Sequence, residues 1–156
     1  MVFSIPTTAE AIYGTVLVCG VIAAESLYDP APGKVLITSV AMLVIFWLTH
    51  VYAKVAAEAG GERATWPSIV EHAREESPML LAVVVPGAAL AAAGLGHVES
   101  GTAISLALWC GVAQLAGAGA LLAHRRGLSA WLIVVNGVIC GASGLLVVLL
   151  KTLLHQ

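Results

Sequence analysis

Five apolar segments, each close to or above the length that a bilayer requires, constrain this chain more than any other feature. They cover residues 9–28, 34–57, 78–94, 102–124 and 128–154. A helix needs about 20 predominantly apolar residues to cross the hydrocarbon core, and it satisfies its own backbone hydrogen bonds there. We therefore predict an all-α fold, in which one transmembrane domain over residues 1–156 forms a polytopic helical bundle with five spans.

The composition agrees with a membrane location. The chain is 60% hydrophobic and only 10% charged, whereas a soluble domain carries about 25% charged residues. Its formal net charge is −2, without a basic tail or stripe, so we expect the lipid bilayer and not nucleic acid as a partner. The cysteines Cys19, Cys110 and Cys140 form no CxxC motif, and we interpret them as small packing residues.

One charged stretch separates the second and third apolar segments. Trp66, Ile69, Val70 and Ala73 follow the spacing of one helical face, while the other face is charged. This pattern predicts a short amphipathic helix over residues 66–77 that lies on the cytoplasmic membrane surface or against the bundle.

Proline and glycine interrupt the third apolar segment. Pro86 and Gly87 stand at its centre, and a proline inside a helix removes one hydrogen bond and clashes with the preceding turn. We therefore expect a kink at Pro86-Gly87.

The basic residues predict the orientation of the chain. With five spans, most of them fall on one side of the membrane: Lys54, Arg63, Arg74, Arg125 and Arg126. Lys34 and Lys151 fall on the other side. Because cytoplasmic loops are enriched in lysine and arginine, we predict a multi-pass protein of the bacterial inner (plasma) membrane with a cytoplasmic N-terminus and an external C-terminus.

Polar side chains interrupt the apolar segments, mostly toward the cytoplasmic side. At about 1.5 Å per residue, Gln114 and Asn136 lie roughly 12–15 Å deep from that side. An ionisable group within a span is costly and marks a candidate site. The candidate residues for an ion path or its gating are His50, Glu10, Thr49, Tyr13, Gln114, Asn136, Glu25 and Lys54.

These residues suggest a water-accessible vestibule. His50 would titrate near neutral pH, Glu10 would supply a counter-charge, and Glu25 would place a second carboxylate near the outer mouth. Structural roles remain open as alternatives. His50, Gln114 and Asn136 could form hydrogen bonds between helices; Lys54 could extend toward the headgroups; Glu10 could belong to a capping box after Pro6.

We predict no catalytic residue, no metal and no other cofactor. His72 has Glu75 and Glu76 three and four residues later, but this pattern is common on solvated helices. Gly141-Ala142-Ser143-Gly144 resembles the GxSG motif of rhomboid proteases, yet no later histidine lies within a span, since only His155 follows. Ser143 is therefore interpreted as a packing residue.

Small residues are dense along the apolar segments, and they include Gly14, Gly20, Gly111, Gly117, Gly119, Gly137, Gly141 and Gly144. Helices in a bilayer associate where small side chains let their backbones approach. We expect part of these glycine- and alanine-rich faces to pack the bundle and the rest to form the interface of a homo-oligomer.

Two segments carry a resemblance to other proteins. Ala11-Ile12-Tyr13-Gly14 and Phe46-Trp47-Leu48-Thr49-His50-Val51-Tyr52-Ala53 resemble uncharacterised small integral membrane proteins of actinobacteria. The resemblance extends over the whole chain and implies no known activity. From the residues, the expected function is a small homo-oligomeric channel or passive transporter for ions, with cations or protons favoured. The alternatives are a non-catalytic membrane scaffold or accessory subunit and a small integral membrane enzyme.

Overall fold

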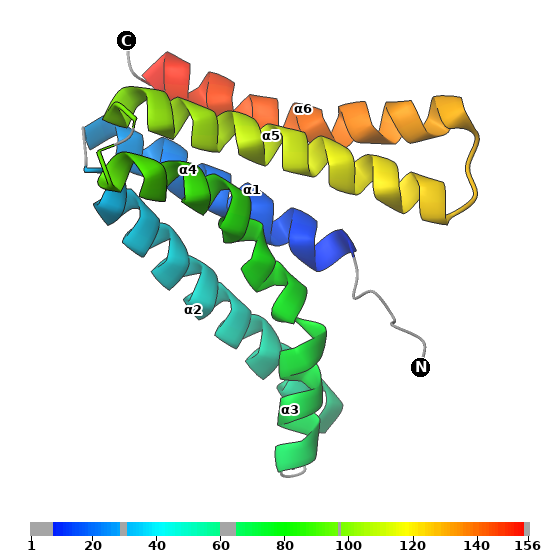
Figure 1. Cartoon of the computed structure of the whole chain (residues 1–156). Coiled ribbons are helices and arrows are strands. Elements are labelled where there is room, and N and C mark those ends of the chain that lie inside the picture. Colours follow the sequence, from blue (N-terminus) through cyan, green and yellow to red (C-terminus); the bar gives the residue numbers. More distant parts are fainter. Residues whose placement is uncertain (1–7, 29–30, 60–64, 97, 155–156) are drawn as a thin grey trace.

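The computed structural model describes residues 8–28, 31–59, 65–96 and 98–154, and every regular element within these ranges is helical (Figure 1). The predicted all-α bundle is thereby confirmed. The elements are α1 (Thr8–Glu25), η1 (Ser26–Tyr28), α2 (Pro32–Ala59), α3 (Trp66–Glu75), η2 (Ser77–Val83), α4 (Val84–Gly94), α5 (Ser100–Arg125) and α6 (Ala130–Leu154).

Five helical segments have the length and the hydropathy that crossing a membrane requires. They are Ala9–Tyr28, Pro32–Glu58, Trp66–Gly94, Ser100–Arg125 and Ala130–Leu150. The chain is therefore a multi-pass membrane protein. Within the third segment the charged residues all precede Ser77. Residues 77–94 therefore have the composition of a membrane-crossing part, and α3 has the composition of an interfacial helix.

The third crossing departs from α-helical geometry before its proline. Residues Ser77–Val83 form the 3₁₀-helix η2, and α4 begins at Val84 with Pro86 in its first turn. Pro86 has no N–H to donate to Ala82, and its ring crowds the carbonyl of that residue. The change from 3₁₀ to α geometry therefore falls between Val83 and Val84, on the N-terminal side of Pro86 and within one turn of it.

The helices form two arms with α1 between them (Figure 1). The first arm contains α2, α3, η2 and α4, and the second contains the antiparallel pair α5 and α6. Helix α1 packs against η2 and α2 on one side and against α5 on the other, and α4 also packs on α5. The arms diverge toward one end, where α1 and α6 begin and α2 and α5 end (Figure 1); we call this the α3 end.

Close backbone approach holds the arms to α1. A methyl group on Gly14 would lie 2.6 Å from the carbonyl oxygen of Met79, and one on Gly111 would overlap the sulfur of Cys19. Between α5 and α6 the same role falls to four glycines: Gly119, Gly137, Gly141 and Gly144. Most of the glycines along the spans therefore pack against other helices of the same chain, while Gly20 and Gly117 face open space.

The centre of the bundle is apolar and closed. Val18 and Ile22 of α1, Met79 of η2 and Leu90 of α4 are each fully buried. Many large apolar side chains on the outside of the helices are exposed, as expected for surfaces that face lipid tails.

Among the described residues, four exposed aromatic side chains lie near the α3 end, whereas Tyr28 of η1 and Trp109 of α5 are exposed elsewhere. The four are Tyr13 in the second turn of α1, Tyr52 near the end of α2, Trp66 at the start of α3 and Trp131 at the start of α6. Tyrosine and tryptophan prefer the headgroup region, so these residues are suited to the membrane–water interface on this side.

Candidate functional site: a charged cluster beside α3

An ion pair joins α2 to the junction between α3 and η2. Lys54 points from α2 toward Glu76, and its Nζ lies 2.5 Å from Glu76 Oε1. The Lys54 side chain is 43% exposed, whereas the Glu76 side chain is fully buried. Lys54 Nζ also lies 3.9 Å from Glu75 Oε2. A buried carboxylate requires such a counter-charge, because its desolvation is otherwise strongly unfavourable.

Helix α1 brings a second carboxylate to this place. Glu10 lies one turn before Gly14 and Glu76 lies one turn before Met79, and Gly14 and Met79 are in contact. Glu10 is also close enough to attract Lys54 electrostatically. One oxygen of Glu10 (Oε2) and Oε2 of Glu76 are buried without a hydrogen-bond partner among the described residues. The part of the capping-box prediction that involves Thr7 lies outside the described residues.

A second set of contacts fastens α3 to the end of α2. His72 Nε2 lies 2.7 Å from Glu58 Oε2, and His72 Nδ1 lies 3.2 Å from Glu75 Oε2. Ser68 Oγ donates a hydrogen bond to the same Glu58 oxygen at 3.2 Å. Both ring nitrogens can donate only in the imidazolium form. Glu58 first, and then Glu75, therefore raise the pKa of His72 above its usual value.

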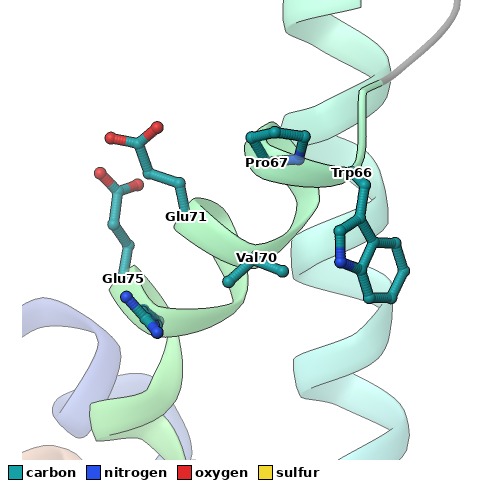
Figure 2. Close-up of a pocket in the computed structure, with 6 residues that line it drawn as sticks. Trp66, Pro67, Val70, Glu71 and Glu75 are labelled. Atoms are coloured by element: carbon teal, nitrogen blue, oxygen red, sulfur yellow. The ribbon is translucent and has the colours of Figure 1, made fainter.

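Two open cavities flank α3. The larger one, about 590 Å³, is lined by Trp66, Pro67, Val70, Glu71, Arg74 and Glu75. Figure 2 shows the carboxylates of Glu71 and Glu75 extending the same way from successive turns, with the Trp66 ring on the other side of Val70. The smaller cavity, about 380 Å³, is lined by Lys54, Ala57, Glu58, His72 and Glu75.

Lys54, Glu10, Glu75 and Glu76 form what we call the charged cluster. Two of its members, Glu10 and Lys54, are among the candidates from the sequence. His50 lies one turn before Lys54 but packs its ring against Phe46, with 4.7 Å between the ring centroids. Thr49 is exposed and donates its hydroxyl to the Ile45 carbonyl. Neither His50 nor Thr49 lines the two cavities beside α3.

The remaining candidates lie elsewhere. Tyr13 is 61% exposed on the outside of α1, and Glu25 is half-buried in the last turn of the same helix. Asn136 donates its amide to the Leu132 carbonyl within α6. Gln114 on α5 has its Oε1 buried without a partner among the described residues. Of the four spans expected to line a vestibule, only α1 and α2 contribute to the charged cluster, together with the α3–η2 junction.

Sequence reasoning missed Glu76, Glu58 and His72. It interpreted residues 71–76 as a solvated acidic face, and this holds for Glu71 but not for Glu76. The position of Glu76 could have identified it, since it is the last charged residue before the uncharged stretch 77–94. In the part of the chain that the structure describes, no group of three or more histidine, cysteine or acidic side chains is arranged to hold a metal ion.

Comparisons with known proteins add no functional assignment to this geometry. No protein-family model, no curated protein and no solved structure matches the chain.

Proposed function

We propose that this chain is the subunit of a small homo-oligomeric channel or passive transporter for ions, with cations or protons favoured. The observation that carries the proposal is the fully buried carboxylate of Glu76, which shares the single ammonium of Lys54 with Glu10. A carboxylate is costly to bury, and ionisable groups inside membrane segments typically mark ion pathways; Glu76 stands directly before the apolar stretch 77–94. Two carboxylates facing one ammonium leave a negative balance, which favours cations over anions.

The path would run between subunits. Beyond the cluster, the fully buried apolar residues Val18, Ile22 and Met79 fill the space between α1 and η2. A single chain therefore offers the mouth of a path, and a continuous route needs neighbouring copies. Gly20 and Gly117, which have no neighbour against their backbones, suit such contacts.

The proposed orientation follows from charge. The α3 end carries Lys54, Arg74, Arg125 and Arg126, so it is assigned to the cytoplasm of a bacterium and the membrane to its inner (plasma) membrane. The N-terminus is then cytoplasmic and the C-terminus external. Cations would enter the charged cluster from the cytoplasmic side.

The test is ion flux into liposomes that contain the purified protein, with proton, potassium and chloride gradients measured separately. Selective cation flux that falls with Glu76→Gln would support the path. Glu99→Gln is the matched control, because Glu99 is an exposed carboxylate at the opposite end of the bundle. Flux of no ion above empty liposomes would contradict the proposal.

A scaffold or accessory subunit is the second candidate, and a specific observation favours it. Several polar side chains within the spans donate to carbonyls of their own helix: Thr15, Thr49, Ser105, Asn136 and Ser143. Hydrogen bonds of this kind satisfy the donors without any contact with a permeating ion, as a scaffold requires. Absence of flux would therefore move the assignment to this class.

A further inference from the structure

The turn between α5 and α6 presents two arginines in a fixed geometry. Arg125 ends α5, Arg126 caps it, and Gly127 adopts φ 69°. The Gly127 N–H donates to the His124 carbonyl and the Leu128 N–H donates to the Ala123 carbonyl, which is the bonding pattern of a Schellman motif. Both arginines are exposed, and no carboxylate of the described residues pairs with them.

The larger cavity beside α3, which we call the α3 groove, is lined by side chains that can bind an arginine. Glu71 and Glu75 offer two carboxylates from successive turns. Trp66, 75% exposed, also lines this groove, and its ring lies on the other side of Val70 from the carboxylates (Figure 2). Guanidinium groups bind carboxylates through paired hydrogen bonds and stack on indole rings. Arg74 is the one cation in the lining. Glu75 also contacts His72 and Lys54, so Glu71, which makes no ion pair within the described residues, is the carboxylate that an incoming arginine would meet first.

The two surfaces lie on the same side of the membrane but far apart in one chain. Two crossings, residues 77–94 and α5, separate α3 from the α5–α6 turn. In Figure 1 helix α3 lies at the tip of one arm and the α5–α6 turn at the tip of the other. One copy therefore cannot join its own two surfaces, whereas neighbouring copies in the same membrane present them at the same boundary.

We propose that the Arg125-Arg126 turn of one copy docks into the Trp66–Glu71–Glu75 groove of the next copy. The contact is head-to-tail, and repeated around an axis along the membrane normal it closes a ring. This inference rests on the homo-oligomer of the proposed function and assigns its cytoplasmic contact. Glu75 lines both the groove and the smaller cavity beside Lys54, so the docked turn would lie next to the charged cluster.

The test uses full-length chains with two different affinity tags, co-expressed so that mixed oligomers form. Capture through one tag measures how much of the other copy co-purifies. Glu71→Arg should lower co-purification about tenfold, because it turns the attraction into repulsion. Glu71 makes no ion pair within the described residues, so this exposed substitution leaves the fold intact. Arg126→Glu should lower co-purification to a similar extent.

The combined chain, Glu71→Arg with Arg126→Glu, restores opposite charges at every contact and should regain wild-type co-purification. Lys34→Glu is the control, since Lys34 is exposed at the opposite end, and it should change nothing. Unaltered association in the single variants, or no recovery in the combined chain, would overturn the contact. So would wild-type copies that do not co-purify.

Two further outcomes distinguish this contact from lipid binding and from ion conduction. In vesicles of phosphatidylcholine alone, the single variants should still lose association and the combined chain should still regain it. If Arg126→Glu lowers co-purification only when phosphatidylglycerol is present, and Glu71→Arg has no effect, the turn binds lipid headgroups and the contact is overturned.

Ion flux is measured on the same preparations. Ion flux together with association that does not depend on these charges would reject the contact and leave the proposed function standing. Charge-dependent association without ion flux would support the contact and reject the proposed function.

Discussion

Lys54 and Glu76 form an ion pair in which the ammonium is half exposed and the carboxylate is fully buried. The asymmetry matters because the two groups lose unequal amounts of hydration on folding. Glu76 depends on Lys54 for compensation, whereas Lys54 could be solvated without Glu76. The pair also connects α2 to the α3–η2 junction, next to Glu10 of α1, so it ties three parts of the fold together.

Substitution of Lys54 alone should therefore lower the free energy of unfolding more than substitution of Lys54 and Glu76 together. Lys54→Met leaves a buried charge uncompensated and should lower the free energy of unfolding by about 3 kcal/mol, the low end for a buried pair because Lys54 is half exposed. Lys54→Met combined with Glu76→Leu should be near wild type. Unfolding in detergent, followed by circular dichroism, measures both. Lys34→Met serves as the control, and a double variant as unstable as the single one would contradict this role of the pair.

Attachment of α3 to α2 should depend on pH through His72. The His72 pKa is raised in the folded protein, above an unfolded value of about 6.5, first by Glu58 and then by Glu75. A raised pKa means that the stabilisation is complete below the unfolded pKa and is lost as the pH rises through the folded pKa. Protection of the α3 amides against hydrogen exchange, corrected for intrinsic rates, should therefore fall as the pH rises above about 6.5.

The matched substitutions for this pH effect are His72→Gln and His124→Gln. His72→Gln removes the charge and should make α3 protection independent of pH over the same range. His124→Gln changes an exposed histidine with no carboxylate partner among the described residues, so the pH dependence should remain. An unchanged profile in His72→Gln would show that another group titrates.

The contact between Gly14 and Met79 should tolerate no side chain. Gly14→Ala places a methyl 2.6 Å from a backbone oxygen, and overpacking of this kind costs about 1–3 kcal/mol. Gly20→Ala on the same helix meets open space and should be neutral or slightly stabilising. Thermal unfolding in one detergent compares the two variants. Equal stability of the two would mean that α1 and η2 separate at little cost.

Gln114 and Asn136 offer a direct comparison of structural and ion-path roles. Gln114→Met removes a buried, unpartnered amide oxygen and should be neutral or stabilise the protein by about 1 kcal/mol. Asn136→Ala removes a hydrogen bond within one helix and should cost about 1 kcal/mol or less. If either side chain lines an ion path, its substitution would instead change flux in liposomes without a matching change in stability.

The sequence by itself determined the spans and the amphipathic helix. Hydropathy over about 20 residues and the 3.6-residue period are local properties, and they predicted α3 as well as the five helical segments that are long and apolar enough to cross a membrane. They also singled out Glu10 and Lys54, because an ionisable residue in an apolar segment is conspicuous in any context.

Only the tertiary structure decided which polar groups meet. Glu76 has the same charge as its neighbour Glu75, yet one is buried and the other half exposed, because α3 packs on α2 and its last turn rotates Glu76 inward. Likewise, Gly14 packs on Met79 while Gly20 meets nothing. Such pairings depend on the rotation and crossing of helices that are distant in sequence, and no local pattern specifies these two quantities.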